Sequence, residues 1–270
     1  MKNDHQRALR GDVGGWSEGA TRRNTRFLYS VQEDQLDGHG WTATLTLKHC
    51  PPSAEAWHRI RRAWIKRMER LGLVRLHWVT EWQKRGVPHL HCALWFSEEA
   101  YQKHGIAECY KAMNLSWLAV ASEYEPRFLS QYFAPINDAI GWFQYLSKHA
   151  ARGVKHYQRS AESIPPAWKQ KTGRMWGHTG QWSVKEAVRI NLEGAEGDGG
   201  FYAFRRLVRS WRHADARAAH NRHRIRLARR MLACNARPLS EVRGLSEWVP
   251  EGIQEAMLAN LATRGYRVTC

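Results

Sequence analysis

Two histidines stand one residue apart in the segment 88–96, which reads Pro-His-Leu-His-Cys-Ala-Leu-Trp-Phe. On a β-strand, alternate side chains point to the same face, so that His89 and His91 lie side by side. The apolar residues between and after them point to the opposite face, toward a core. Two imidazoles held together on a strand form half of a site for a divalent metal ion.

Glu81 is the candidate for a third ligand. Residues 74–82 alternate like a second strand, and the polar connection that follows contains Gly and Pro, as in a hairpin turn. In such a hairpin, Glu81 lies roughly opposite His89 on the same face. Two histidines and one carboxylate favour Mg²⁺ or Mn²⁺, with positions open for a phosphate oxygen, over a closed structural zinc site. His77 on the same face is a weaker fourth candidate, and two surface histidines without a metal are the alternative.

Tyr145 and Lys148 are three residues apart in a segment with helical spacing, so they lie on one side of the predicted helix. A phenol is a weak nucleophile at neutral pH because it is almost fully protonated. A nearby ammonium group and a metal-bound phosphate would each favour the phenolate or its attack. A tyrosine at the edge of the core with a solvated lysine explains this short pattern by itself, but the histidine strand upstream favours a nucleophile.

The elements that must hold these residues follow from the apolar spacing. Residues 41–47 alternate apolar residues with Thr, as in a half-buried strand. Apolar residues at helical spacing predict helices over 53–72 and 97–124, and the tyrosine helix is expected over 138–153. Strands and helices joined by short connections favour an α+β domain with an antiparallel sheet.

Composition divides the chain into four segments. Residues 1–26 are polar and contain glycine, as in a flexible arm. Residues 27–185 hold the sheet and the candidate ligands. Residues 186–202 are acidic and glycine-rich, as in a linker or loop, and residues 203–270 form a basic region that is expected to be helical.

The net charge indicates a polyanionic partner, because Lys and Arg exceed Asp and Glu by 42 − 25 = 17. Nucleic acid is favoured over a membrane, since no long apolar run and no amphipathic anchor occur; a cytoplasmic location is expected.

Two further features of the composition are informative. The fourteen tryptophans could stack on bases, although about two-thirds of them are expected to fill the core. The five scattered cysteines favour neither a disulfide framework nor a thiolate zinc site.

Arginines are concentrated near the start of the basic region, where Asp215 is the only acid between Phe201 and Cys234. Helical spacing puts four of them near one face of a helix: Arg205, Arg206, Arg209 and Arg212. Such a stripe can hold phosphates, so that DNA affinity would fall with salt; a solvated helix face is the alternative. Arg174, with Trp176 and Trp182, could clamp a substrate strand, but a core role at a strand edge is equally supported.

In chain order, three segments resemble the motifs of the HUH-endonuclease rolling-circle replication initiators, or Rep proteins, of plasmid or filamentous-phage type. They are Thr44-Leu-Thr-Leu47, Glu81 with Pro88-His-Leu-His91, and Tyr145-Leu-Ser-Lys148. The similarity covers roughly residues 27–180, and its second motif is the most specific. It implies a ferredoxin-like antiparallel sheet with the histidines on a central strand and the tyrosine on a packed helix, so that residues 27–185 would be a nicking endonuclease domain.

The resemblance also implies a reaction. Tyr145 would attack one strand of single-stranded or cruciform origin DNA with metal assistance, forming a 5′-phosphotyrosine and freeing a 3′-hydroxyl primer. No GxxxxGK[ST] loop occurs, so a host helicase would unwind the DNA for the polymerase. Relatives with a second tyrosine place it four residues after the first, where this chain has His149. A single-tyrosine protein would need a second subunit or an activated water to close the strand.

Other functions stay open. A non-catalytic origin-binding protein or repressor on the same scaffold would explain the charge, but it has no need of a metal beside a phenol. A single-tyrosine HUH transposase shares the motif order, although such enzymes are typically compact and lack an arginine-rich tail. Conjugative relaxases have the nucleophile before the histidines. An unrelated metalloenzyme for small molecules explains the histidines but not the charge.

Overall fold

A computed structural model of the chain describes residues 14–147, 157–169, 171–194, 199–230 and 249–270. The chain divides into two compact units, Met1–Val184 and Lys185–Cys270. None of the helices in the described ranges is long and apolar enough to cross a membrane.

The first unit is built on a five-stranded antiparallel sheet with the strand order β4-β1-β3-β2-β5. Its strands are β1 (His39–Leu45), β2 (Leu73–Trp82), β3 (Pro88–Phe96), β4 (Tyr132–Pro135) and β5 (Trp176–Gly180). The predicted α+β class is confirmed, with the histidine motif on the central strand. The two outer strands were not predicted, because segments of four and five residues are too short to show an alternating pattern.

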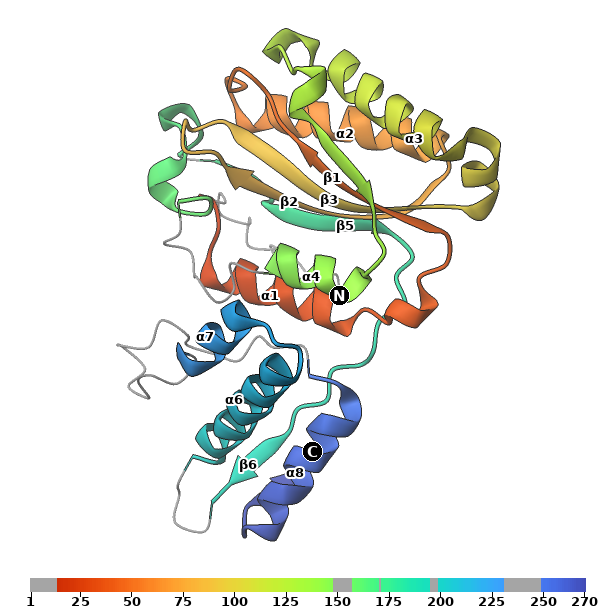
Figure 1. The fold of residues 1–270 in the computed structure, drawn as a ribbon. Helices are drawn as coiled ribbons and strands as arrows, with labels where there is room; N and C mark the ends of the chain where they lie inside the picture. The colour runs from red at the N-terminus through yellow and green to blue at the C-terminus, as the bar shows by residue number, and fades with distance from the viewer. Residues whose placement is uncertain (1–13, 148–156, 170, 195–198, 231–248) are drawn as a thin grey trace, which may run out of the picture. The chain divides into compact units, whose positions relative to one another are not determined.

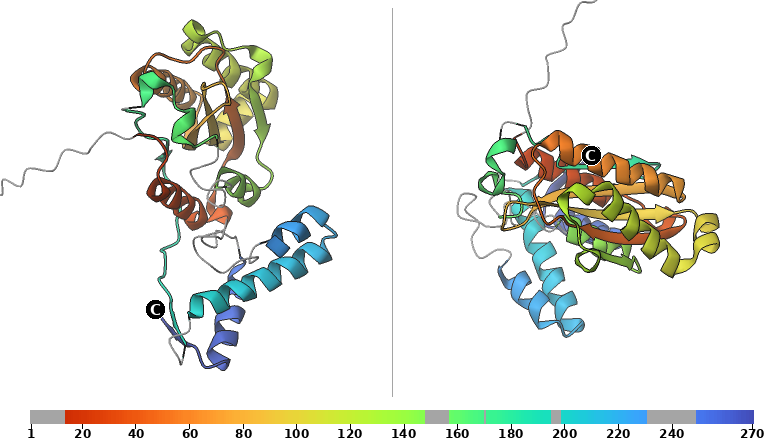
Figure 2. Two further views of the ribbon diagram at one scale, coloured as in Figure 1. Left: turned by 90° about the vertical axis from the view of Figure 1, so that its left-hand side faces the viewer. Right: turned by 90° about the horizontal axis from the view of Figure 1, so that it is seen from above.

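Helices cover both faces of this sheet (Figure 1). They are α1 (Glu18–Ser30), α2 (Ala54–Arg70), α3 (Glu98–Val120) and α4 (Ala139–Ser147). Helices α2 and α3 cover one face and run side by side when the molecule is viewed from above (Figure 2). Helices α1 and α4 lie together against the other face (Figure 1). Because both faces are covered, every residue of β3 is buried.

Tryptophans form much of the core, as expected. Trp117 of α3 packs edge-to-face against Trp57 and Trp64 of α2, with ring centroids 6.0 and 6.2 Å apart. Nine tryptophans are buried in the first unit: Trp16, Trp41, Trp57, Trp64, Trp78, Trp82, Trp95, Trp117 and Trp168. Aromatic packing therefore anchors the helices that support the sheet.

The prediction of a flexible arm over residues 1–26 is wrong for its last part, because helix α1 begins at Glu18. The Ser17 hydroxyl accepts a hydrogen bond from the Ala20 backbone N–H and caps the helix. The buried side of α1 contains several polar residues, namely Thr21, Asn24 and Thr25. An apolar stripe is therefore largely missing from the sequence, and periodicity could not reveal this helix.

The second unit contains three helices and a two-stranded sheet among its described residues. Its elements are β6 (Asn191–Glu193), α6 (Gly200–Ala218), α7 (Arg222–Arg230), α8 (Glu251–Thr263) and β7 (Arg267–Thr269). Val208, Val249 and Met257 form its buried apolar cluster. The segment 186–202 is more than the expected linker, because β6 pairs with β7 and helix α6 begins within the segment.

Candidate active site

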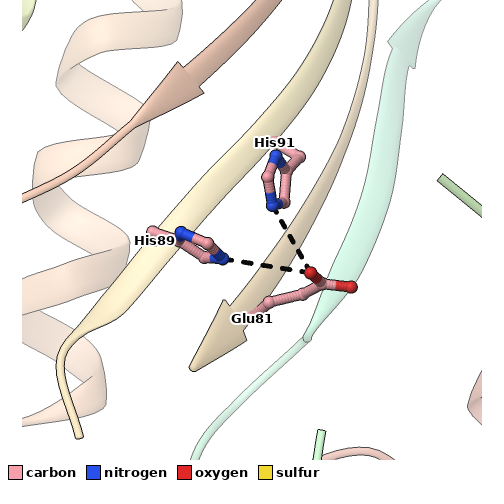
Figure 3. A group of neighbouring side chains, drawn as sticks. All are labelled: Glu81, His89 and His91. Carbon is pink, nitrogen blue, oxygen red and sulfur yellow. Dashed lines mark ion pairs between the residues drawn. The ribbon is translucent and has the colours of Figure 1, made fainter. Parts of the chain in front are cut away.

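Glu81, His89 and His91 converge on one point between β2 and β3 (Figure 3). The predicted hairpin register is confirmed, with Glu81 paired to His89. The Glu81 Oε2 atom lies 3.9 Å from His89 Nε2 and 3.4 Å from His91 Nε2. One ligand atom from each of the three residues falls within 4.8 Å of the others. All three side chains are almost fully buried.

This donor set fits a divalent metal ion. The His89 Nε2 atom is buried and accepts or donates no hydrogen bond within the described part of the chain, and a buried polar atom of this kind is costly unless something binds it. Two imidazole nitrogens and one carboxylate oxygen face one another at the spacing of atoms that share an ion. The donor set therefore suits Mg²⁺ or Mn²⁺.

Thr44 of β1 orients the second histidine. Its Oγ1 atom lies 2.9 Å from His91 Nδ1, across the β1–β3 pair that aligns the two residues. When Nε2 binds a metal ion, the ring proton stays on Nδ1 and is donated to the threonine hydroxyl. This bond fixes the tautomer and the rotation of the ring, as such outer contacts do in known metal sites.

We expect Thr44→Val to weaken Mn²⁺ binding roughly 10- to 100-fold, because the isosteric methyl group cannot accept the His91 proton. Thr42→Val is the matched control: Thr42 is buried on the same strand, and its hydroxyl makes no hydrogen bond within the described residues. Calorimetric titration with Mn²⁺ measures both variants against the wild type. Equal affinities for the Thr44 variant and the wild type would rule out this orienting role.

The second carboxylate oxygen of Glu81 points away from the histidines (Figure 3). It accepts a hydrogen bond from Arg159 Nε at 3.2 Å, and Nη2 of the same guanidinium lies 3.2 Å from the same oxygen. Both side chains are buried. The carboxylate is thus divided, with one oxygen facing the histidines and the other held by a buried cation.

Tyr145 lies on α4 beside His91, one of the candidate metal ligands. Its ring centroid is 5.7 Å from that of His91, in an edge-on arrangement, and 4.8 Å from that of Trp142, against which it stacks. The tyrosine is 39% exposed, whereas Phe143 and Leu146 are buried and dock the helix. The tyrosine ring is therefore held against His91 while the side chain stays open to solvent. Lys148 and His149 lie outside the described residues.

His77 is not a fourth ligand. Its Nε2 atom lies 2.8 Å from the Asn24 Oδ1 atom of α1, and its ring packs on Phe27. Burial lowers its pKa to about 3, so the ring is neutral.

Two tryptophans that could have clamped a substrate strand pack inside the first unit. Trp176 and Trp182 both contact Phe27, in agreement with a core role at a strand edge.

The four arginines predicted to form a phosphate-binding stripe on α6 are used differently. Arg205 is only 3% exposed, and Arg209 donates hydrogen bonds from Nε and Nη2 to the carbonyl groups of Ala228 and Arg229 on α7. Arg212 is half-buried and Arg206 is exposed. Helical spacing predicted a common face, but much of that face packs inside the second unit. In the first unit, Arg174 is exposed just before β5.

Sequence reasoning missed two residues at the site. Arg159 lies far from the histidine motif in the chain and belongs to no periodic element, so no local signal pointed to it. Trp142 stands three residues before the tyrosine, and this helical spacing could have predicted the stacked pair.

The sequence matches the ORF2-type family of replication-associated proteins over residues 40–181. A protein of Xylella fastidiosa strain 9a5c that is named as a replication protein is 54% identical over 271 residues, which cover 100% of this chain and 93% of the relative. A replication-associated protein of Pseudomonas phage Pf3 is 51% identical over 260 residues, or 96% of this chain and 90% of the relative. No solved structure matches. The chain therefore belongs to the ORF2-type family of replication-associated proteins, within the rolling-circle Rep proteins that its motifs resemble.

Proposed function

We propose that this protein initiates rolling-circle replication by nicking one DNA strand at an origin, with Tyr145 as the nucleophile. The observation that carries the proposal is the contact between the Tyr145 and His91 rings at 5.7 Å. A solvent-accessible phenol beside three converging metal ligands has the parts needed for attack on a phosphodiester. The family membership supports replication as the process that this chemistry serves.

Glu81, His89 and His91 would hold the divalent ion. An ion bound there, Mg²⁺ or Mn²⁺, would withdraw charge from the scissile phosphate and favour nucleophilic attack on it. Three protein ligands converge among the described residues, so coordination positions would stay open for phosphate oxygens. The ring stack of Trp142 on Tyr145 would restrict the rotation of the phenol ring beside His91.

The proposed step is an in-line displacement. Tyr145 Oη forms a bond to phosphorus while the bond from phosphorus to the 3′ oxygen breaks. The phenol loses a proton and the leaving oxygen takes one up, so that a 5′-phosphotyrosine and a 3′-hydroxyl are formed. Lys148 would favour the phenolate through its positive charge. The hydroxyl is a primer for a host polymerase, with a host helicase opening the duplex.

Covalent attachment is the experiment that tests this function. Purified protein is incubated with a labelled single-stranded library and Mn²⁺, with and without EDTA, and then boiled in detergent. We expect an adduct that EDTA prevents, and sequencing of the attached strand would identify the origin. Tight DNA binding without an adduct in any metal would leave an origin-binding protein and reject the nickase.

Exposed arginines of α7 and Arg206 of α6 are the proposed phosphate contacts of the second unit. In the first unit, the proposed phosphate contact is Arg174. Helix α7 contains no acidic residue, and three of its arginines are exposed at helical spacing: Arg222, Arg226 and Arg229. Asp215 is ion-paired with Arg224 at 2.7 Å, so its charge is directed to a neighbour. This face is suited to a phosphate backbone rather than to bases, since it carries no aromatic residue.

We expect the replacement of the three exposed α7 arginines by Gln to weaken single-stranded DNA binding and to reduce the salt dependence. The slope of log affinity against log salt would fall by about 2, at about 0.7 per phosphate contact. The control replaces three exposed arginines of α2 by Gln: Arg59, Arg62 and Arg70. Binding measured by anisotropy at several salt concentrations decides the assignment, and an equal loss in the control would assign the effect to net charge alone.

A further inference from the structure

Arg159 joins the metal centre to the tyrosine helix. Its Nε atom donates to Glu81 Oε1, and its Nη2 atom donates to the Leu146 carbonyl oxygen, each at 3.2 Å. Leu146 follows Tyr145 directly in the last turn of α4. A single guanidinium thus contacts both a metal ligand and the end of the helix that carries the nucleophile.

The surroundings keep this arginine in place. Its side chain has no exposed area, and its guanidinium lies 3.9 Å from the centroid of the Trp16 ring. Trp16 is itself fixed by a hydrogen bond from Nε1 to the Thr80 carbonyl at 2.9 Å. The Gln158 carbonyl accepts a hydrogen bond from the Trp82 backbone N–H at 2.8 Å, which ties the turn before Arg159 to the end of β2.

A buried cation with these contacts has two electrostatic partners. The Glu81 carboxylate provides the counter-charge, and the Leu146 carbonyl oxygen provides a second, dipolar acceptor. The planar guanidinium can donate in both directions at once, whereas a lysine ammonium has no rigid fork that spans two acceptors. Arginine is therefore suited to fix the position of the helix relative to the carboxylate.

We propose that Arg159 is a positioning residue that sets the place of Tyr145 relative to the metal centre, by holding Glu81 and the end of α4 together. This inference rests on the proposed function of the site. Arg159 does not touch the reacting atoms in this arrangement; it acts through Glu81 and through the helix. A displacement of about 1 Å at the reacting atoms can slow a reaction about 10²-fold, so the link has a measurable consequence.

The test is Arg159→Lys, compared with Arg61→Lys as the matched control. Arg61 also lies over a tryptophan ring, at 3.5 Å from Trp78, but it belongs to α2 on the opposite face of the sheet. The lysine at position 159 is expected to keep the charged pair with Glu81 and to lose the carbonyl of Leu146. We expect the single-turnover rate of adduct formation at saturating Mn²⁺ to fall 10- to 100-fold, with Mn²⁺ affinity changed less than about threefold. The Arg61 variant should keep the wild-type rate.

Three outcomes would overturn the proposal. They are an unchanged rate, an equal loss of rate in the Arg61 variant, and a loss of Mn²⁺ affinity as large as the loss of rate. The third would mean that Arg159 acts on Glu81 alone.

Hydrogen exchange on the wild-type protein tests the link without DNA and without a variant that must fold. Addition of Mn²⁺ is expected to slow exchange in peptides from β2, β3 and α4, because Arg159 connects the metal ligand to the helix. Protection of the strands without α4 would reject the link. A protein that shows the α4 protection but forms no adduct would instead reject the nickase and keep the link, so the two failures are distinguishable.

Discussion

We expect the Tyr145→Phe protein to form no covalent adduct with DNA at any Mn²⁺ concentration, while it binds DNA and Mn²⁺ as the wild type does. The substitution removes the one oxygen that would attack phosphorus, so no slower route through this side chain remains. It leaves the ring that contacts His91 and stacks on Trp142. Adduct is measured by detergent gels, and binding by anisotropy and calorimetry.

A conservative change elsewhere in the chain provides the control for this experiment. Tyr157 is 41% exposed, close to the 39% of Tyr145, but it lies beyond α4 (Ala139–Ser147) in the chain. Tyr157→Phe should form adduct at the wild-type rate. If Tyr145→Phe still forms adduct and Tyr157→Phe does not, the nucleophile is Tyr157 and the assignment to α4 is wrong.

The convergence of Glu81, His89 and His91 could be predicted from sequence because one hairpin contains all three residues. Alternation fixes which side chains share a face, and the length of the turn fixes the register, so Glu81 had to meet His89. The docking of Tyr145 followed from helical periodicity, since Phe143 and Leu146 mark the buried side. The spacing of residues along the chain is sufficient to predict a contact when both side chains lie on the same helix or on two strands joined by a short turn.

Contacts between distant segments left no such pattern. Arg159 reaches Glu81 across 78 positions of the chain, and nothing in its neighbourhood distinguishes it from a surface arginine. The arginines of α6 show the same limit in reverse. Their spacing predicted a shared face, but it could not show that Arg209 donates hydrogen bonds to carbonyl groups of α7 and not to a phosphate. Helical spacing assigns side chains to a face, and only tertiary packing decides what that face contacts.

The second large effect distinguishes Glu81 from His89, two proposed metal ligands whose replacement is expected to lower activity equally. We expect Glu81→Gln and His89→Gln each to lower the rate of adduct formation about 10³-fold, since a metal ion stabilises the transition state by several kcal/mol. Their effects on folding should differ. Glu81 also neutralises Arg159, and both side chains are buried, whereas the His89 Nε2 atom has no hydrogen-bond partner among the described residues.

Removal of one partner from a buried ion pair costs about 3–5 kcal/mol, because the remaining charge stays in a poorly solvating environment. Without added metal, the Glu81 variant should therefore unfold about 3 kcal/mol more easily than the wild type, and the His89 variant should be close to the wild type. The measurement is urea denaturation followed by tryptophan fluorescence, which reports mainly on the first unit, since this unit contains all tryptophans except Trp211 and Trp248. Wild-type protein at a Mn²⁺ concentration 100 times the dissociation constant should gain about 2.7 kcal/mol in its free energy of unfolding, and both variants should gain less.

Equal stability of the two variants without metal would show that Arg159 does not depend on Glu81 for its charge balance. The carboxylate would then serve the metal ion alone, and the link from Glu81 to the tyrosine helix would lose its electrostatic basis.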